Sequence, residues 1–80
     1  MSSFDENEYL TSDFLETVVL KYLGYKLLFV DRTERRAIFH FEFQGDIDEV
    51  LNALRGHELK VEPFSFYQCE REVKSRLYGV

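Results

Sequence analysis

The stretch YKLLFVDRTERRAIFHFEF, residues 25–43, decides the fold of this 80-residue chain. Its second half alternates strictly, because Phe39, Phe41 and Phe43 occupy every second position. Side chains of a strand point alternately to its two faces, so this pattern predicts a half-buried strand with the three rings in the core. Residues 25–32 are rich in aromatic and aliphatic side chains. They predict the preceding strand of an antiparallel hairpin, with a short polar loop between the two strands.

The preceding strand is apolar on both faces, which a hairpin covered on one side does not explain. With regular alternation, Leu27 and Phe29 share one face, and Leu28 and Val30 share the other. If helices cover the first face, a patch of Leu28, Val30 and Ile38 stays open, and a two-stranded ribbon also keeps two open edges. We therefore expect a homodimer whose dimer face is this patch. The alternative is that a helix covers each face within the monomer.

A helix is predicted before the hairpin, in TSDFLETVVLKYLG, residues 11–24. Its apolar side chains recur with helical spacing and form one broad face. Ser12 or Asp13 can serve as the N-cap, and Asp13 with Glu16 fits a capping box. Gly24 lies where a left-handed residue commonly ends a helix.

Two further helices are predicted after the hairpin. In GDIDEVLNALRG, residues 45–56, Asp46 is the expected N-cap and Glu49 completes a capping box. In EPFSFYQCEREVKSRLYG, residues 62–79, Pro63 suits the first helical position. The predicted order of elements is therefore α-β-β-α-α.

This order indicates the fold class, because helices and strands do not alternate as in parallel β-α-β units. We expect residues 11–80 to form a single small α+β domain in which an antiparallel hairpin packs against helices. Residues 1–10 are expected to be a flexible acidic lead-in.

Charge and cysteine content restrict the partners and the compartment. The formal net charge is −5, and Asp5, Glu6 and Glu8 contribute three of the negative charges. Phosphates repel an acidic chain, which argues against a plain nucleic-acid binder and favours contact with a basic protein surface. Cys69 is the only cysteine, so no disulfide can form within the chain. With neither a signal peptide nor a long apolar stretch, we expect a soluble cytoplasmic protein that does not contact membranes.

Signatures of catalysis are weak. The chain has none of the usual glycine-rich nucleotide, zinc-protease or nucleophile-elbow motifs. His40 and Glu42 share a strand face and are the best acid–base pair, but a polar strand face explains them as well. A metal site would need His40, His57 and Cys69 from different elements, and Cys69 falls on the apolar stripe of its helix. We expect no enzyme activity, no metal and no cofactor.

Two charged clusters are candidate binding residues. Arginines gather at the hairpin turn, near a lysine of the first strand, and could contact a phosphate: Lys26, Arg32, Arg35 and Arg36. A solvated turn is the alternative. Carboxylates at the start of the second predicted helix could contact a protein: Asp46, Asp48 and Glu49. Helix capping is the alternative there, and for Asp5, Glu6 and Glu8 the alternative is a solvated tail.

Several of these residues carry a resemblance to a known family. The features are Thr11-Ser12-Asp13, the segment LGYKLL at residues 23–28, and the strand with Arg35, Arg36, Phe39 and Phe41. Over roughly residues 11–78 the chain resembles a family of small, functionally uncharacterised domains from bacteriophage and bacterial genomes. The acidic amino-terminal segment departs from the family pattern. The resemblance implies a phage or prophage source, a bacterial host and a small accessory role, and it implies no activity.

Together these observations predict a non-catalytic phage-type accessory protein that binds another protein, such as a host or defence factor, and thereby inhibits it. Two alternatives stay open. The first is a dimer that binds or sequesters a nucleotide through the hairpin arginines. The second is a DNA-binding accessory protein.

Overall fold

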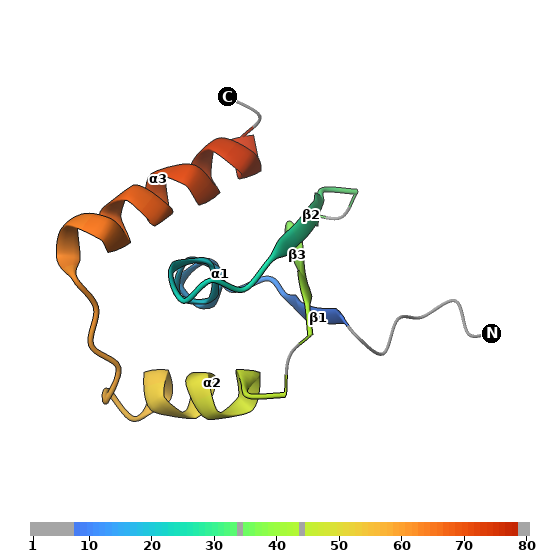
Figure 1. Cartoon of the computed structure of the whole chain (residues 1–80). Coiled ribbons are helices and arrows are strands. Elements are labelled where there is room, and N and C mark those ends of the chain that lie inside the picture. Colours follow the sequence, from blue (N-terminus) through green and yellow to red (C-terminus); the bar gives the residue numbers. More distant parts are fainter. Residues whose placement is uncertain (1–7, 34, 44, 79–80) are drawn as a thin grey trace.

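The computed structural model describes residues 8–33, 35–43 and 45–78, and residues 1–7 of the expected lead-in lie outside this range. The elements in chain order are β1 (Glu8–Thr11), α1 (Phe14–Tyr22), β2 (Leu27–Asp31), β3 (Ile38–Glu42), α2 (Ile47–Arg55) and α3 (Pro63–Tyr78). The α+β class and the order α-β-β-α-α are confirmed, with one additional strand in front. Figure 1 shows the helices on one side of the sheet, with α1 between the sheet and α3.

The additional strand corrects the expected lead-in at residues 8–10. β1 pairs antiparallel with β3, so the sheet has the order β1-β3-β2 and β3 is its central strand. Tyr9 lies opposite Phe41, and Thr11 lies opposite Phe39. Both β1 side chains therefore face the covered side of the sheet, which anchors this segment.

A β-bulge changes the faces of β2. Leu27 lies opposite Phe41, but Phe29 lies opposite His40, so Leu28 is an extra residue in the ladder. The phase of the alternation shifts at this point, and Val30 turns to the covered side, where it packs against the core. Leu28, Val30 and Ile38 therefore do not share one face of the sheet, and the dimer face predicted from them is wrong.

The core lies between the sheet and the helices. Phe39 and Phe41 are buried, as predicted, and pack with buried side chains of all three helices. These include Val18, Leu20, Ile47, Leu51 and Val73. Phe43 was expected beside the other two rings, but it is 39% exposed. β3 ends at Glu42, so the alternation no longer directs the next ring inward.

Helix α1 begins and ends as predicted, although its capping box stays incomplete. The carboxylate of Asp13 accepts a hydrogen bond from the Glu16 backbone N–H at 3.0 Å. The Glu16 carboxylate does not return this bond, because its Oε1 accepts from the hydroxyls of Tyr9 at 3.0 Å and Thr11 at 2.9 Å. It therefore joins α1 to β1. Gly24 has a φ of +97°, the left-handed conformation expected after the helix.

The other two helices differ in their caps. Asp46 holds the N-cap position of α2, but its side chain makes no capping hydrogen bond. The predicted capping box is therefore wrong. At α3, the carboxylate of Glu62 accepts from the backbone N–H groups of Phe64 at 3.2 Å and Ser65 at 2.7 Å. These bonds lower the pKa of Glu62, chiefly through Ser65. Pro63 is the first helical residue, as predicted.

Candidate functional site

The side of the sheet opposite the helices carries a cluster that we call the open sheet face, made of Leu10, Phe29, Ile38 and His40. Phe29 and Leu10 lie on either side of His40 in the register. Leu10 is 51% exposed and Phe29 is 47% exposed. These two exposed apolar side chains lie on the same face of the sheet, and a joined apolar patch is the kind of surface through which proteins associate.

His40 lies at the centre of the open sheet face and joins its three strands. Its ring stacks on Phe29 of β2, with the ring centroids 4.0 Å apart and 19° between the planes. Its Nδ1 lies 2.9 Å from Oε1 of Glu8 on β1. The pair predicted from the sequence was His40 with Glu42, because the strand that carries Glu8 was not predicted.

The open sheet face has a basic end and an acidic end. At the basic end, Arg35 and Arg36 line a depression of about 480 Å³ together with Asp31 and residues of the open sheet face. At the acidic end, Glu8 lies opposite Glu42 in the register. Asp31 adds a negative charge to the basic end.

The Asp31 carboxylate is itself held within the hairpin connection. It accepts from the Thr33 backbone N–H at 3.0 Å and from the Thr33 hydroxyl at 2.7 Å. These bonds lower its pKa, the backbone one most. Asp31 therefore stays ionised and turned toward the loop.

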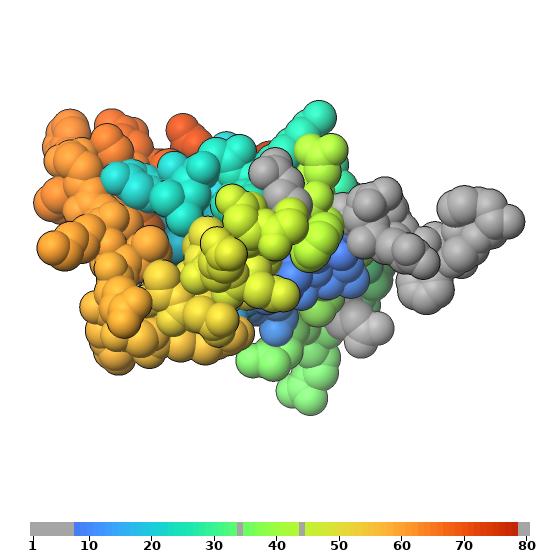
Figure 2. Space-filling view, turned by 60° about the horizontal axis from the view of Figure 1, so that its bottom comes forward, coloured from blue at the N-terminus to red at the C-terminus, as the bar shows by residue number. Residues whose placement is uncertain are grey.

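A second depression, which we call the arginine hollow, lies at the hairpin end of the molecule. Figure 2 shows the connection between β2 and β3, in green, projecting from the body of the protein. Arg32, Arg35 and Arg36 come from this connection and line a hollow of about 500 Å³. Its other lining residues are Ser12, Phe14, Ala37, Phe39, Leu77 and Tyr78. Three of the four predicted phosphate contacts thus come together.

Lys26 does not join these arginines. It immediately precedes β2 and is exposed, and its backbone carbonyl accepts from the Glu42 N–H at 3.0 Å. It therefore lies at the opposite end of the hairpin from the connection that holds the arginines. The prediction that Lys26 joins the three arginines is therefore wrong.

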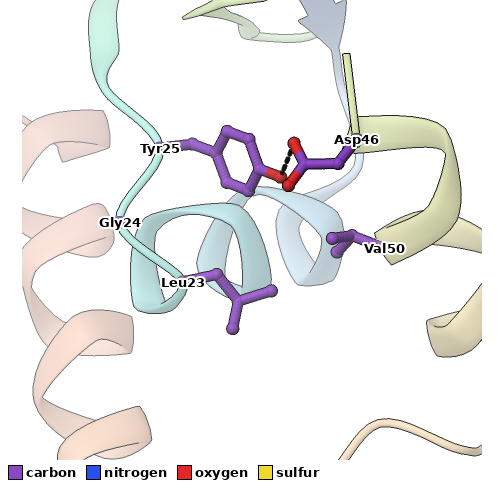
Figure 3. Close-up of a pocket in the computed structure, with 5 residues that line it drawn as sticks. All are labelled: Leu23, Gly24, Tyr25, Asp46 and Val50. Carbon is purple, nitrogen blue, oxygen red and sulfur yellow. Dashed lines mark hydrogen bonds between the residues drawn. The ribbon is translucent and has the colours of Figure 1, made fainter. Parts of the chain in front are cut away.

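A third pocket, of about 260 Å³, lies between the end of α1 and the start of α2. Figure 3 shows the Tyr25 hydroxyl directed at Asp46, to whose Oδ1 it donates a hydrogen bond at 2.5 Å. Burial, followed by the bond to Asp46 and its charge, raises the pKa of Tyr25 to about 12. Asp46 is thus engaged within the fold. Asp48 and Glu49 are exposed in the first turn of α2, and their role in protein contact stays a prediction.

The remaining candidates for chemistry are scattered. Within residues 8–33, 35–43 and 45–78, no three His, Cys, Asp or Glu side chains form a group that could hold a metal ion. Cys69 is half-buried and packs against the core, while His57 is exposed after α2. Across the same residues, every helix is too short or too polar to cross a membrane.

The fold and these surfaces define a class: over the described residues, a small α+β domain whose three-stranded antiparallel sheet is covered by helices on one face only. The chain belongs to the family described as Domain of unknown function (DUF5659), whose model matches residues 6–79. The match begins before β1, so it includes the strand that the sequence analysis missed. No curated protein and no solved structure matches the chain.

Proposed function

We propose that this protein is a non-catalytic module that binds another protein through its open sheet face. The observation that carries the proposal is the exposure of Leu10 and Phe29 on a face that the helices leave uncovered. Apolar area removed from water stabilises a complex by about 25 cal/mol per Å² before the costs of association. Each aromatic ring offers a large area, so Phe29 is the natural centre of the interface.

The environment of His40 supports a binding role over catalysis. One face of its ring is occupied by Phe29, and its Nδ1 is engaged by Glu8. These contacts fix the ring within the sheet. His40 therefore acts as a rigid part of the surface in this proposal.

The partner that fits this surface is a second copy of the chain. Two open sheet faces can stack about a two-fold axis that runs perpendicular to the strands. The basic end of one copy then lies over the acidic end of the other, which brings Arg35 and Arg36 opposite Glu8 and Glu42. A two-fold contact uses the same patch twice, so this charge pattern is self-complementary.

Sedimentation equilibrium tests this dimer. We expect the wild-type chain to dimerise at micromolar concentrations and Phe29→Ser to remain monomeric. Phe64→Ser is the matched control, because Phe64 is an exposed ring on α3, outside the open sheet face. A wild-type chain that stays monomeric at high micromolar concentration, or a Phe29→Ser dimer of undiminished strength, contradicts the proposal.

We further propose that the protein acts as a phage-encoded accessory factor in the cytoplasm of a bacterial host, where it binds and inhibits a host or defence protein. Support comes from the family resemblance and from the net charge of −5, which suits a basic protein surface. Capture from a bacterial lysate, with wild-type, Asp48→Ala and Phe64→Ser as baits, tests this role, because Asp48 is an exposed predicted protein contact outside the face used by the dimer. A partner retained by wild-type and Phe64→Ser alone supports it, and equal recovery with all three baits contradicts it.

A further inference from the structure

We propose that the arginine hollow binds a nucleoside phosphate, with the phosphate on the guanidinium groups and the planar base against the aromatic side chains. The hollow shares Arg35 and Arg36 with the depression at the basic end of the open sheet face, whereas Arg32 and Tyr78 line the hollow and not that depression. Because the proposed dimer places Arg35 and Arg36 opposite Glu8 and Glu42, nucleotide binding is measured on the Phe29→Ser chain, which is expected to be monomeric, as well as on wild type.

The arginine hollow presents positive charges that lack a carboxylate partner within the part of the chain that the structure describes. Among the described residues, Arg35 and Arg36 have no carboxylate within ion-pair distance, although the chain as a whole is acidic. The nearby Asp31 carboxylate lines the depression on the open sheet face and is held by Thr33. Unpaired guanidinium groups present several N–H donors in a planar fork that suits phosphate oxygens. Residues 31–36 carry three arginines against Asp31 and Glu34, a net charge of +1, in a chain whose net charge is −5.

The side chain of Arg32 is already held in place before any ligand binds. Its Nη1 donates a hydrogen bond to the backbone carbonyl of Leu77 in the last turn of α3. Carbonyls at the end of a helix have no intrahelical partner, so this bond satisfies one of them. The remaining N–H groups of Arg32 are left for a ligand, and less side-chain entropy is lost when it binds.

The lining of the hollow determines the kind of anion. Phe39 is buried beneath it, Phe14 is half-buried, and the Tyr78 ring is 68% exposed. A free phosphate would leave these apolar surfaces unused, whereas a planar base can stack on an aromatic ring. The volume of about 500 Å³ falls in the range of small-molecule sites. A nucleoside monophosphate combines both features in one molecule.

Isothermal titration calorimetry with the four nucleoside 5′-monophosphates tests the site. At least one of them is expected to bind, while inorganic phosphate and the matching nucleoside bind about tenfold more weakly or not at all. Arg32→Gln and Tyr78→Ala should each weaken binding by about tenfold or more. Lys26→Gln is the matched control, since it removes a positive charge at the opposite end of the hairpin, outside the hollow.

Several results would overturn the proposal. They are an absence of binding up to millimolar nucleotide, equal affinity for inorganic phosphate, and equal losses in Lys26→Gln and Arg32→Gln. Salt-dependent binding of a DNA oligonucleotide without binding of any mononucleotide would assign the arginines to nucleic acid instead. Circular dichroism of each variant separates lost binding from lost folding, and Arg32→Lys provides a milder change if Arg32→Gln unfolds. Nucleotide binding by Phe29→Ser distinguishes this site from the open sheet face.

Discussion

The rings of Phe29 and His40 stack across β2 and β3, with their centroids 4.0 Å apart and 19° between the ring planes. This contact exists because the bulge in β2 brings Phe29 opposite His40. Without the extra residue, Phe29 would point to the same side as Leu27, into the core. The bulge therefore places an aromatic ring on the open sheet face, where it can meet a partner.

Replacing Phe29 should affect association more than folding. Phe29→Ala is expected to lower the free energy of unfolding by about 2 kcal/mol, because the half-buried ring loses about 1 kcal/mol of burial and its aromatic pair loses about 0.5–1.5 kcal/mol more. Phe41→Ala should cost about 3–5 kcal/mol, since it leaves a cavity under a fully buried ring. Urea denaturation of both variants measures the contrast. Similar costs for the two would show that Phe29 belongs to the core.

The bulge is also where prediction from the sequence fails. Leu27, Leu28, Phe29 and Val30 are all large and apolar, so alternation alone cannot reveal which residue is extra. The predicted faces of β2 were correct at Leu27 and wrong after it. By contrast, the central strand was predicted correctly at Phe39 and Phe41, since polar residues separate its rings.

Contacts between distant elements account for the other differences. Asp46 has the sequence of a good N-cap, but Tyr25 competes for its carboxylate from 21 residues away. β1 is only four residues long, too short for its alternation to stand out. The clue was the pair of hydroxyl-bearing side chains at Tyr9 and Thr11, which could bond the same acceptor from one face of a strand. Local signals such as Asp13 and Gly24 were reliable because they depend on neighbouring residues alone.

Glu16 is expected to hold β1 in place. Glu16→Ala leaves the hydroxyls of Tyr9 and Thr11 without their shared acceptor, in a partly buried setting. Loss of such partners costs about 1–3 kcal/mol. Hydrogen exchange should show faster exchange of β1 amides than of α3 amides in this variant. Unchanged protection of β1 would mean that its pairing with β3 suffices.

The caps of α1 and α3 should contribute measurably to stability. Asp13→Ala removes a carboxylate that accepts from a backbone N–H in the first turn and should cost about 1 kcal/mol. Glu62→Ala removes two such bonds and should also lower the free energy of unfolding. Glu72→Ala is the control, because its ion pair with Lys21 is exposed and should contribute no more than about 0.5 kcal/mol. Urea denaturation at neutral pH ranks the three. Equal effects for all would show that the capping bonds are not maintained in solution.

Stability should fall at alkaline pH through two tyrosines. Burial and hydrogen bonds to carboxylates raise the pKa values of Tyr9 and Tyr25 to about 12, from the ordinary value of 10.0. The folded state therefore holds protons that the unfolded state releases. Their contribution is fully present below about pH 10 and is lost as the pH rises from about 10 to 12. Urea denaturation at about pH 8 and about pH 11 measures this loss.

A pair of variants tests whether Tyr25 contributes to this alkaline loss of stability, because other side chains also titrate between about pH 10 and 12. Tyr25→Phe should be less stable than wild type at about pH 8, because Asp46 loses its hydroxyl partner, yet it should lose less stability on going to about pH 11. Tyr67→Phe is the control, since that ring is exposed on α3 and its loss should leave the pH dependence unchanged. Absorbance of the tyrosinate form should show Tyr25 ionising only near unfolding. If Tyr25→Phe and wild type lose stability equally, the bond to Asp46 does not control the alkaline limit.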